Sequence, residues 1–315
     1  KGEYGRRISE LEKSMDFQLD LLQKQAVEET LTKGVVVVTG GPGTGKTTTI
    51  NLMIRCFEME KMDIVLAAPT GRAAKRMTEA TGYEAKTIHR LLEVSGGIED
   101  GDSSHFEKNE DNPIEADAVI LDEMSMVDIH LMYSLLKAIV PGTRLILVGD
   151  SNQLPSVGPG NVLKDIIDSK AFSVVRLSKI YRQAESSHIV LNAHKINAGE
   201  LITLDNKNKD FFFFEKKDVR SVMGALVYLV KTRLPEYIGA SPFEIQVLTP
   251  MRKGELGVEH LNEVLQYYLN PASESKKEKE GRTGVFREGD KVMQVKNNYK
   301  LEWKITNAKG FSIEE

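Results

Sequence analysis

The stretch VVVVTGGPGTGKTTT, residues 35–49, constrains the fold of this chain more than any other segment. Its four consecutive valines are typical of a strand buried on both faces of a parallel sheet. The glycines that follow allow the backbone to curl around an anion, and the next residues, TTTINLMIRCFEME, are compatible with a helix whose N-terminus faces the same anion. A strand, a glycine loop and a helix in this order predict an α/β fold with a phosphate-binding loop.

The loop fits the pattern G-x-x-x-x-G-K-T, which assigns separate tasks to its residues. Lys46 supplies a positive charge for the β- and γ-phosphates, and Thr47 supplies a hydroxyl for Mg²⁺. A dinucleotide site is disfavoured because G-x-G-x-x-G does not occur here. We therefore expect ATP and Mg²⁺ as cofactors. The nucleotide-contacting residues of the loop are expected to be Gly41, Pro42, Gly43, Thr44, Gly45, Lys46, Thr47 and Thr48.

Two later segments end in polar side chains where a buried strand is expected to stop. In ADAVILDEMSMVD (116–128), Asp122 is placed to hold Mg²⁺ through water, and Glu123 to orient or deprotonate the attacking water. In TRLILVGDSNQLPSVGPG (143–160), Gln153 is placed to sense the γ-phosphate. A solvated strand end and an ordinary polar turn are the alternatives. The phosphate loop favours the catalytic interpretation, since carboxyl ends of parallel strands share one sheet edge.

Six motifs follow one another along the chain: GGPGTGKTTT, APTGRAAKRM, TIHRLL, LDEMSMVD, VGDSNQLPSVGPGNVL and IYRQ. Their order is similar to the order seen in superfamily 1 helicases. The residues of these motifs most resemble the RecD-like branch, of the exodeoxyribonuclease V alpha-subunit (RecD–TraA) type. The resemblance covers residues 18 to about 300. It implies a P-loop NTPase with two RecA-like motor domains, which walks 5′ to 3′ along single-stranded DNA and separates duplexes. Single strands and duplex junctions are thus the implied substrates.

The resemblance also implies roles for individual residues. Gln23 is similar to the glutamine that reads the adenine edge, with Gln25 as a close competitor. Tyr181 resembles the aromatic residue that stacks on adenine, and Arg182 resembles the arginine finger. An arginine there makes physical sense, because its permanent charge neutralises charge on the transferring phosphate. Lys46, Glu123, Gln153 and Arg182 then form the expected catalytic set.

The segment APTGRAAKRMTEATG (68–82) predicts the DNA contact. Arg72, Lys75 and Arg76 share one face of a helix, where they can grip phosphates, with Thr70 adding a contact. A solvated charged face is the alternative. His89, in TIHRLL, either touches the strand or has a structural role.

The domain organisation is expected to comprise lead-in helices (1–34), a first RecA-like domain (35–179) with a small insert at about 93–115, and a partial second domain (180–315). We expect a strand over FEIQVLTP (243–250) and core packing for most of the four phenylalanines at 211–214. The family's two late motifs are not found before Glu315, so the second domain is expected to be incomplete and the chain to be a piece of a longer protein. The end of the chain resembles a strand leading to a small inserted barrel.

Composition limits the remaining classes of function. The 315 residues carry a net charge of −4, so a nucleic-acid partner must be held by a local basic patch. The single cysteine suits a reducing cytoplasm, and no apolar run approaches a membrane span. Recombination or repair proteins are possible partners, and no nuclease activity is expected, because no carboxylate or histidine cluster is visible. The alternatives left open are a P-loop ATPase acting on RNA or protein, and an ATP-binding scaffold subunit.

Overall fold

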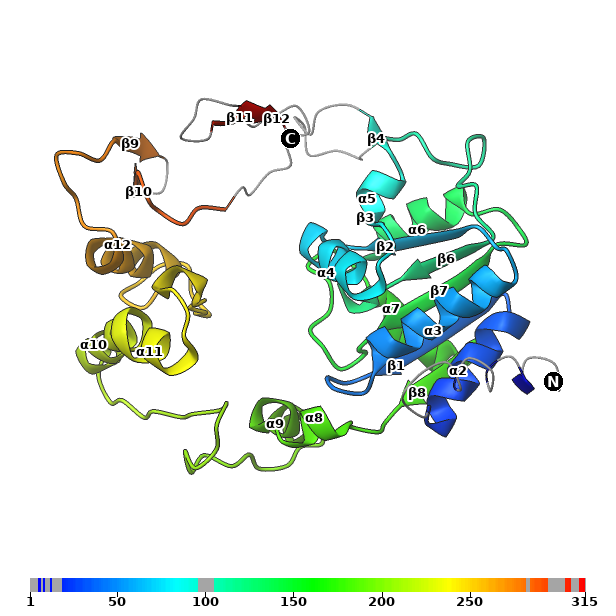
Figure 1. Cartoon of the computed structure of the whole chain (residues 1–315), viewed down its shortest axis with the longest axis horizontal. Helices are drawn as coiled ribbons and strands as arrows, with labels where there is room; N and C mark the ends of the chain where they lie inside the picture. The colour runs from blue at the N-terminus through cyan, green and yellow to red at the C-terminus, as the bar shows by residue number, and fades with distance from the viewer. Residues whose placement is uncertain are drawn as a thin grey trace. The chain divides into compact units, whose positions relative to one another are not determined.

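The computed structural model divides into two compact units, Lys1–Phe213 and Phe214–Glu315 (Figure 1). It describes residues 5, 6, 8, 12, 19–95, 105–281, 284–293, 304–306 and 312–314. Within these ranges, no helix is both long and apolar enough to span a membrane.

The first unit alternates strands and helices along the chain, as expected of an α/β fold. Its strands are β1 (Val35–Gly40), β2 (Ile64–Ala68), β3 (Ala85–Thr87), β4 (Val94–Ser95), β5 (His105–Phe106), β6 (Ala118–Leu121), β7 (Arg144–Gly149) and β8 (Ser173–Leu177). Its helices are α2 (Leu21–Thr32), α3 (Lys46–Met59), α4 (Gly71–Thr81), α5 (Ile88–Leu91), the short 3₁₀ turn η1 (Met124–Met126), α6 (Ile129–Ala138), α7 (Val162–Ser169), α8 (Arg182–Glu185) and α9 (His188–Asn197).

Six of these strands form one sheet in the order β3-β2-β6-β7-β1-β8, and every neighbouring pair is parallel. Alternate residues of β1 face opposite sides: Val36 and Val38 pack with α2 and α3, and Val37 packs with α6 and α7. Because helices cover both faces, the central strands β1 and β6 are runs of buried apolar residues. The α/β class with a parallel sheet is confirmed.

The sheet topology brings the functional segments together at one edge. The chain leaves β1 through the glycine loop and α3, and re-enters the sheet at β2, with β7 and β6 lying between these two strands. In parallel sheets, ligands bind at the carboxyl ends of strands where the strand order reverses. The loops after β1, β6, β7 and β8 all leave from this edge.

The expected insert at 93–115 contains a short hairpin base. Val94 of β4 pairs with Phe106 of β5 in antiparallel register, and residues 96–104 lie outside the described residues. Phe106 packs against the hydrophobic cluster to which α5 and α6 contribute side chains. The insert's single aromatic side chain therefore belongs to the base of the hairpin.

The second unit is built mainly of helices. Its elements are α10 (Val219–Tyr228), the π-helical η2 (Leu229–Arg233), α11 (Leu234–Ile238), η3 (Pro242–Glu244), α12 (Val258–Leu269), β9 (Glu278–Gly281), β10 (Gly284–Arg287), β11 (Lys304–Thr306) and β12 (Ser312–Glu314). The strands form two antiparallel pairs, β9–β10 and β11–β12. Among its described residues, the buried hydrophobic side chains are Val230 and Leu261.

Two local predictions were wrong. Residues 243–250 begin inside η3 and continue without regular structure. A strand needs a neighbour to satisfy its backbone groups, and the described part of the second unit offers none to 243–250. Phe212, Phe213 and Phe214 are 39%, 45% and 58% exposed, so most of the phenylalanine run lies outside the core.

Candidate nucleotide and nucleic-acid sites

The loop between β1 and α3 has the local geometry that its glycines predict. Gly43 and Gly45 adopt left-handed φ values of 75° and 80°, which side chains other than glycine rarely tolerate. The buried Thr44 hydroxyl donates to the Gly41 carbonyl at 2.8 Å and closes the loop. Gly45 also begins α3 with no side-chain cap, so the first N–H groups of a 14-residue helix stay available to an anion.

Lys46 lies at the first position of α3 and folds back over the loop. Its Nζ donates to the carbonyl of Gly40 at 2.7 Å and to that of Gly41 at 3.1 Å. Thr47, the next residue, is exposed, and Thr48 is half-buried. The ammonium and the Thr47 hydroxyl are thus both presented at the sheet edge where a nucleotide phosphate is expected.

Asp122 and Glu123 follow β6 at the same edge. The Asp122 backbone N–H donates to the Ala67 carbonyl at 3.0 Å, and one carboxylate oxygen accepts from the Glu123 N–H at 2.8 Å. Burial raises the pKa of the Asp122 carboxyl, the neighbouring Glu123 charge adds to this, and the Lys46 and Arg76 charges oppose it. A half-buried carboxylate near a phosphate loop is suited to a metal cation, since a cation offsets the cost of its desolvation.

Glu123 has a left-handed φ of 55°. That conformation costs an ordinary residue about 1–2 kcal/mol. It turns the chain sharply between β6 and η1, so Glu123 and Asp122 do not continue the strand's alternation. Backbone strain at a carboxylate beside a phosphate loop is consistent with a functional constraint.

Gln153 lies in the turn after β7, where its side chain is exposed. Its backbone N–H donates to the carbonyl of Asp150 at 3.2 Å. The same turn is joined to β1, because the hydroxyls of Thr39 and Ser151 lie 3.3 Å apart. The structure thus brings the Gln153 backbone to the edge that carries the phosphate loop.

The structure separates the two candidate glutamines. Gln25 is exposed and donates to Glu29 at 2.7 Å. Gln23 is only 2% exposed and lies against the phosphate loop: a Cβ placed on Gly45 would come within 2.8 Å of its Nε2 and 3.0 Å of Tyr181 Cε2. Gln23 and Tyr181 therefore converge on Gly45, although the sequence places them far apart.

Asp20 ties these two residues together, and the sequence analysis missed it. One Asp20 oxygen caps α2 by accepting from the backbone N–H of Gln23 at 2.9 Å, and the other accepts from the Tyr181 hydroxyl at 3.1 Å. Burial, followed by this hydrogen bond, raises the pKa of Tyr181 to about 12. The D-x-x-Q capping box was visible in the sequence, but its partner on Tyr181 was not.

Arg182 is the first residue of α8, directly after Tyr181. The Arg182 side chain lies outside the described residues, so the expected arginine finger is located by its backbone alone.

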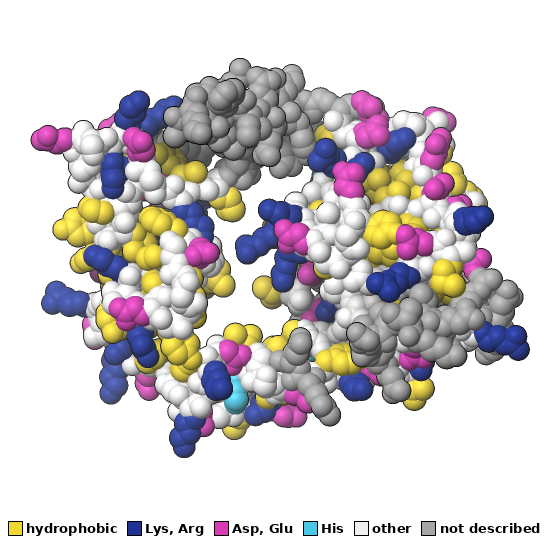
Figure 2. Space-filling model, viewed as in Figure 1, with side chains coloured by type: hydrophobic (Ala, Val, Ile, Leu, Met, Phe, Trp, Pro, Cys, Tyr) yellow, Lys and Arg dark blue, Asp and Glu magenta, His cyan; other side chains and the backbone are white. Residues whose placement is uncertain are grey.

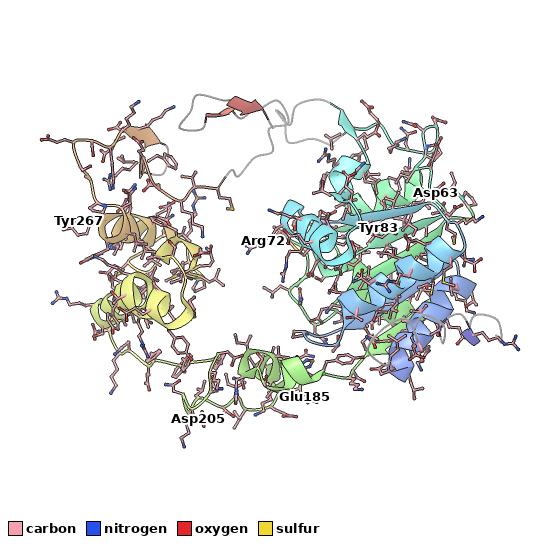
Figure 3. All side chains as sticks on the ribbon, viewed as in Figure 1. Asp63, Arg72, Tyr83, Glu185, Asp205 and Tyr267 are labelled. Carbon is pink, nitrogen blue, oxygen red and sulfur yellow. The ribbon has the colours of Figure 1, made fainter. Side chains whose placement is uncertain are left out.

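The predicted basic stripe lies on α4, which begins at the carboxyl end of β2. Arg72, Lys75 and Arg76 are exposed, and Ala74 and Met77 of the same helix are buried. Arg72 is labelled in Figure 3, and Figure 2 shows Lys and Arg side chains gathered over this helix. The three cations therefore share one solvent-facing surface, as the helical spacing predicts.

Thr70 and His89 have well-defined local roles. Thr70 is the N-cap of α4, and its hydroxyl accepts from the Ala73 N–H at 3.2 Å. His89 is half-buried on α5 with its ring 6.0 Å from that of Phe106, and burial lowers its pKa while the charge of Asp128 opposes this. This packing favours the structural role that the sequence left open for His89.

Comparison with known proteins agrees with this arrangement. Residues 23–159 match the family described as AAA domain, and residues 261–307 match the family described as ATP-dependent RecD-like DNA helicase SH3 domain. The ATP-dependent RecD2 DNA helicase of Deinococcus radiodurans is 38% identical over 85% of this chain. The chain belongs to the RecD-like helicases.

A second relative of this RecD-like chain is the RecBCD enzyme subunit RecD of Mycobacterium tuberculosis, which is 36% identical over 78% of the chain. The alignments cover 34% of the D. radiodurans protein and 48% of the M. tuberculosis protein, so the chain spans a third to a half of these relatives. Among solved structures, the Pif1 helicase from Candida albicans superposes with a TM-score of 0.45 at 20% identity, over 70% of this chain and 55% of that one.

Proposed function

We propose that this chain is the nucleotide-binding motor segment of a cytoplasmic ATP-dependent DNA helicase that moves 5′ to 3′ along single strands in recombination or repair. The observation that carries the proposal is the convergence on one loop of Lys46, the Gln23–Tyr181 pair and, through its charge, Asp122. A phosphate site, an acidic group suited to a metal and a candidate adenine site thus lie at one sheet edge. An ATP-binding scaffold would not need the metal-holding and catalytic carboxylates.

The residues at this edge fit Mg²⁺ and a triphosphate. Gly43 and Gly45 leave no room for a Cβ, so backbone alone forms the cradle. No group of three His, Cys, Asp or Glu side chains gathers as a metal cage in the described part of the chain. Mg²⁺ is therefore expected to rely on phosphate oxygens, with Thr47 and Asp122 holding it, and when bound it neutralises charge on the transferring phosphate.

The chain's own residues would then perform hydrolysis as follows. The Lys46 ammonium would leave the carbonyl oxygens of Gly40 and Gly41 and donate to phosphate oxygens instead. Glu123 orients and deprotonates the attacking water, and Gln153 senses the γ-phosphate. Arg182 neutralises charge as the phosphate is transferred. Gln23 and Tyr181 hold the adenine.

The basic stripe on α4 is proposed to bind DNA phosphates, with Thr70 adding a contact. Phosphate contacts of this kind are independent of sequence, which suits a motor that moves along the strand. The names of the two relatives, a DNA helicase and a RecBCD enzyme subunit, support a DNA substrate and recombination or repair partners. Duplex junctions are the expected substrates.

The first test is ATP turnover with and without single-stranded DNA, beside Lys46→Ala. We expect DNA to stimulate ATP turnover. In Lys46→Ala the turnover should fall more than about 100-fold, because the substitution removes a preorganised charge. Lys33→Ala, at the C-cap of α2, is the matched control and should behave like the parent protein. Stimulation by RNA alone would instead support an RNA-dependent ATPase, and binding without stimulated turnover a scaffold.

Polarity needs a separate test. Duplexes carrying either a 5′ or a 3′ single-stranded tail are offered with ATP, and only the 5′-tailed duplex should be separated. Separation of the 3′-tailed duplex would refute the proposed direction and leave the ATPase assignment intact.

A further inference from the structure

Residues 181–194 lie against the phosphate loop from outside the sheet. The Tyr181 backbone N–H donates to the Gly43 carbonyl at 3.2 Å. His194, in the second half of α9, places its Nε2 3.0 Å from the carbonyl oxygen of Pro42. Two successive loop carbonyls are therefore bound by one segment that is distant from the loop in sequence.

The same segment packs against the loop glycines. A Cβ placed on Gly41 would lie 2.6 Å from Cε1 of His194, and one placed on Gly43 would lie 2.5 Å from the Cβ of Ala184. These distances are too short for any side chain. The contact is thus a close fit between loop backbone and the helices α8 and α9.

The direction of the loop's peptide groups explains why the loop needs hydrogen-bond donors on its outer side. In a trans peptide unit the N–H and C=O point opposite ways, so a loop that turns its N–H groups toward a phosphate turns carbonyls away from it. Outward carbonyls need donors of their own. A carbonyl oxygen only accepts, so His194 Nε2 must carry the proton and donate to Pro42.

The helix that carries His194 is fastened at its other end. Ser187 caps α9 and donates to Asp210 at 2.5 Å, and the His188 backbone N–H donates to Asp210 at 2.9 Å. Asp210 belongs to the segment that runs from α9 to the second unit, which begins at Phe214. The helix α9 is therefore held by Asp210 at its N-terminal end and contacts the phosphate loop through His194.

We propose that His194 is a positioning residue for nucleotide binding, which holds the phosphate loop in its phosphate-accepting conformation by donating to the Pro42 carbonyl. The proposal rests on the proposed ATP site. It assigns His194 no contact with the nucleotide and no step in hydrolysis.

Two substitutions separate the hydrogen bond from the packing. His194→Phe keeps a ring against Gly41 and removes the donor, and His194→Gln keeps a donor and removes the ring. His130→Phe, at an exposed position of α6, is the matched control. Binding of a fluorescent ADP analogue and exchange of the 40–46 amides with deuterium are measured in this chain, together with the melting temperature.

If the hydrogen bond positions the loop, His194→Phe should weaken ADP binding about three- to tenfold, as expected for one lost hydrogen bond. Exchange of the loop amides in the nucleotide-free protein should become faster. His194→Gln should restore most of both properties, and all variants should melt with the parent.

If His194→Phe binds ADP as tightly as the parent protein, the inference is overturned and the proposed ATP site stands. The inference is also overturned if His194→Gln loses as much ADP affinity as His194→Phe, because the packing of the ring would then be the cause. Absence of ADP binding in the parent chain would overturn both the inference and the proposed function.

Discussion

Asp122 shows how burial sets the behaviour of a single residue at this site. Burial raises the pKa of its carboxyl, and Lys46 and Arg76 only partly oppose that shift. A raised pKa in the folded state means that the group favours folding below its ordinary pKa of 3.8, and that this contribution is lost as the pH rises through the raised value. At neutral pH the ionised Asp122 therefore weakens the nucleotide-free fold.

Asp122→Asn should accordingly stabilise the protein without nucleotide while abolishing Mg²⁺-dependent ATP turnover. We expect a melting temperature about 2–4 °C above the parent at pH 7, the shift that roughly 1 kcal/mol produces in a domain of this size. The difference should shrink toward pH 4, where the parent's carboxyl becomes protonated. Thermal melts across this range provide the measurement, and a difference independent of pH would exclude the buried charge as its cause.

The pairing of Asp20 with Tyr181 predicts a specific coupling. Asp20→Ser keeps an N-cap for α2 but is too short to reach the tyrosine hydroxyl, and Tyr181→Phe removes the same hydrogen bond from the other side. Each should raise the KM for ATP about three- to tenfold, and the double variant should cost little more than either single one. Asp218→Ser, at the N-cap of α10, is the control. Additive losses in the double variant would show that Asp20 and Tyr181 act independently.

At the residue scale, the spacing of local motifs predicts Lys46 and Asp122, whereas Gln23 is implied only by the family resemblance. The structure adds that Gln23, and not Gln25, lies against the loop. His194 could not be predicted, because a single histidine on an amphipathic helix carries no local signal. Its partner, Pro42, is brought to it only by the return of the chain after β8.

At the element scale, strand predictions were correct where the segment has neighbouring strands in a sheet, and wrong where it has none. The runs in β1, β6 and β7 are apolar on both faces and lie inside a sheet of six strands. Residues 243–250 alternate apolar and polar side chains over FEIQV, but this pattern does not supply the neighbouring strand that hydrogen bonding requires.

The helix α4 carries the prediction that belongs to this scale. Replacing Arg72 and Lys75 with Ala should weaken binding to single-stranded DNA and lower the slope of log affinity against log salt by about 1.4, or 0.7 for each lost phosphate contact. Arg76 is left intact, because its charge also acts on Asp122. Arg55 with Lys164, an exposed arginine and lysine on α3 and α7, forms the matched control pair. An unchanged slope would mean that the α4 cations are an ordinary solvated surface.

At the scale of the whole molecule, the proposed nucleotide site lies in the first unit. Gln23, the phosphate loop, Asp122 and Tyr181 all lie within Lys1–Phe213, whose sheet is buried on both faces. The sequence could predict the parallel sheet of that unit because its motifs and its hydrophobic runs agree, but the predicted boundary at 179/180 differs from the division after Phe213. In the second unit, Val230 and Leu261 are the buried hydrophobic side chains among its described residues.

This difference in burial predicts two separate unfolding transitions. Buried apolar area is the main source of stability, so the second unit should unfold at a lower temperature than the first. If Mg²⁺–ADP binds the folded first unit as proposed, a concentration of 100 times its Kd should stabilise that unit by about 2.7 kcal/mol and raise only the upper transition. Calorimetry with and without nucleotide makes the measurement, and Lys46→Ala, which weakens phosphate binding, should reduce the shift. If nucleotide raised both transitions together, or if a single transition appeared, the two units would be unfolding as one cooperative structure.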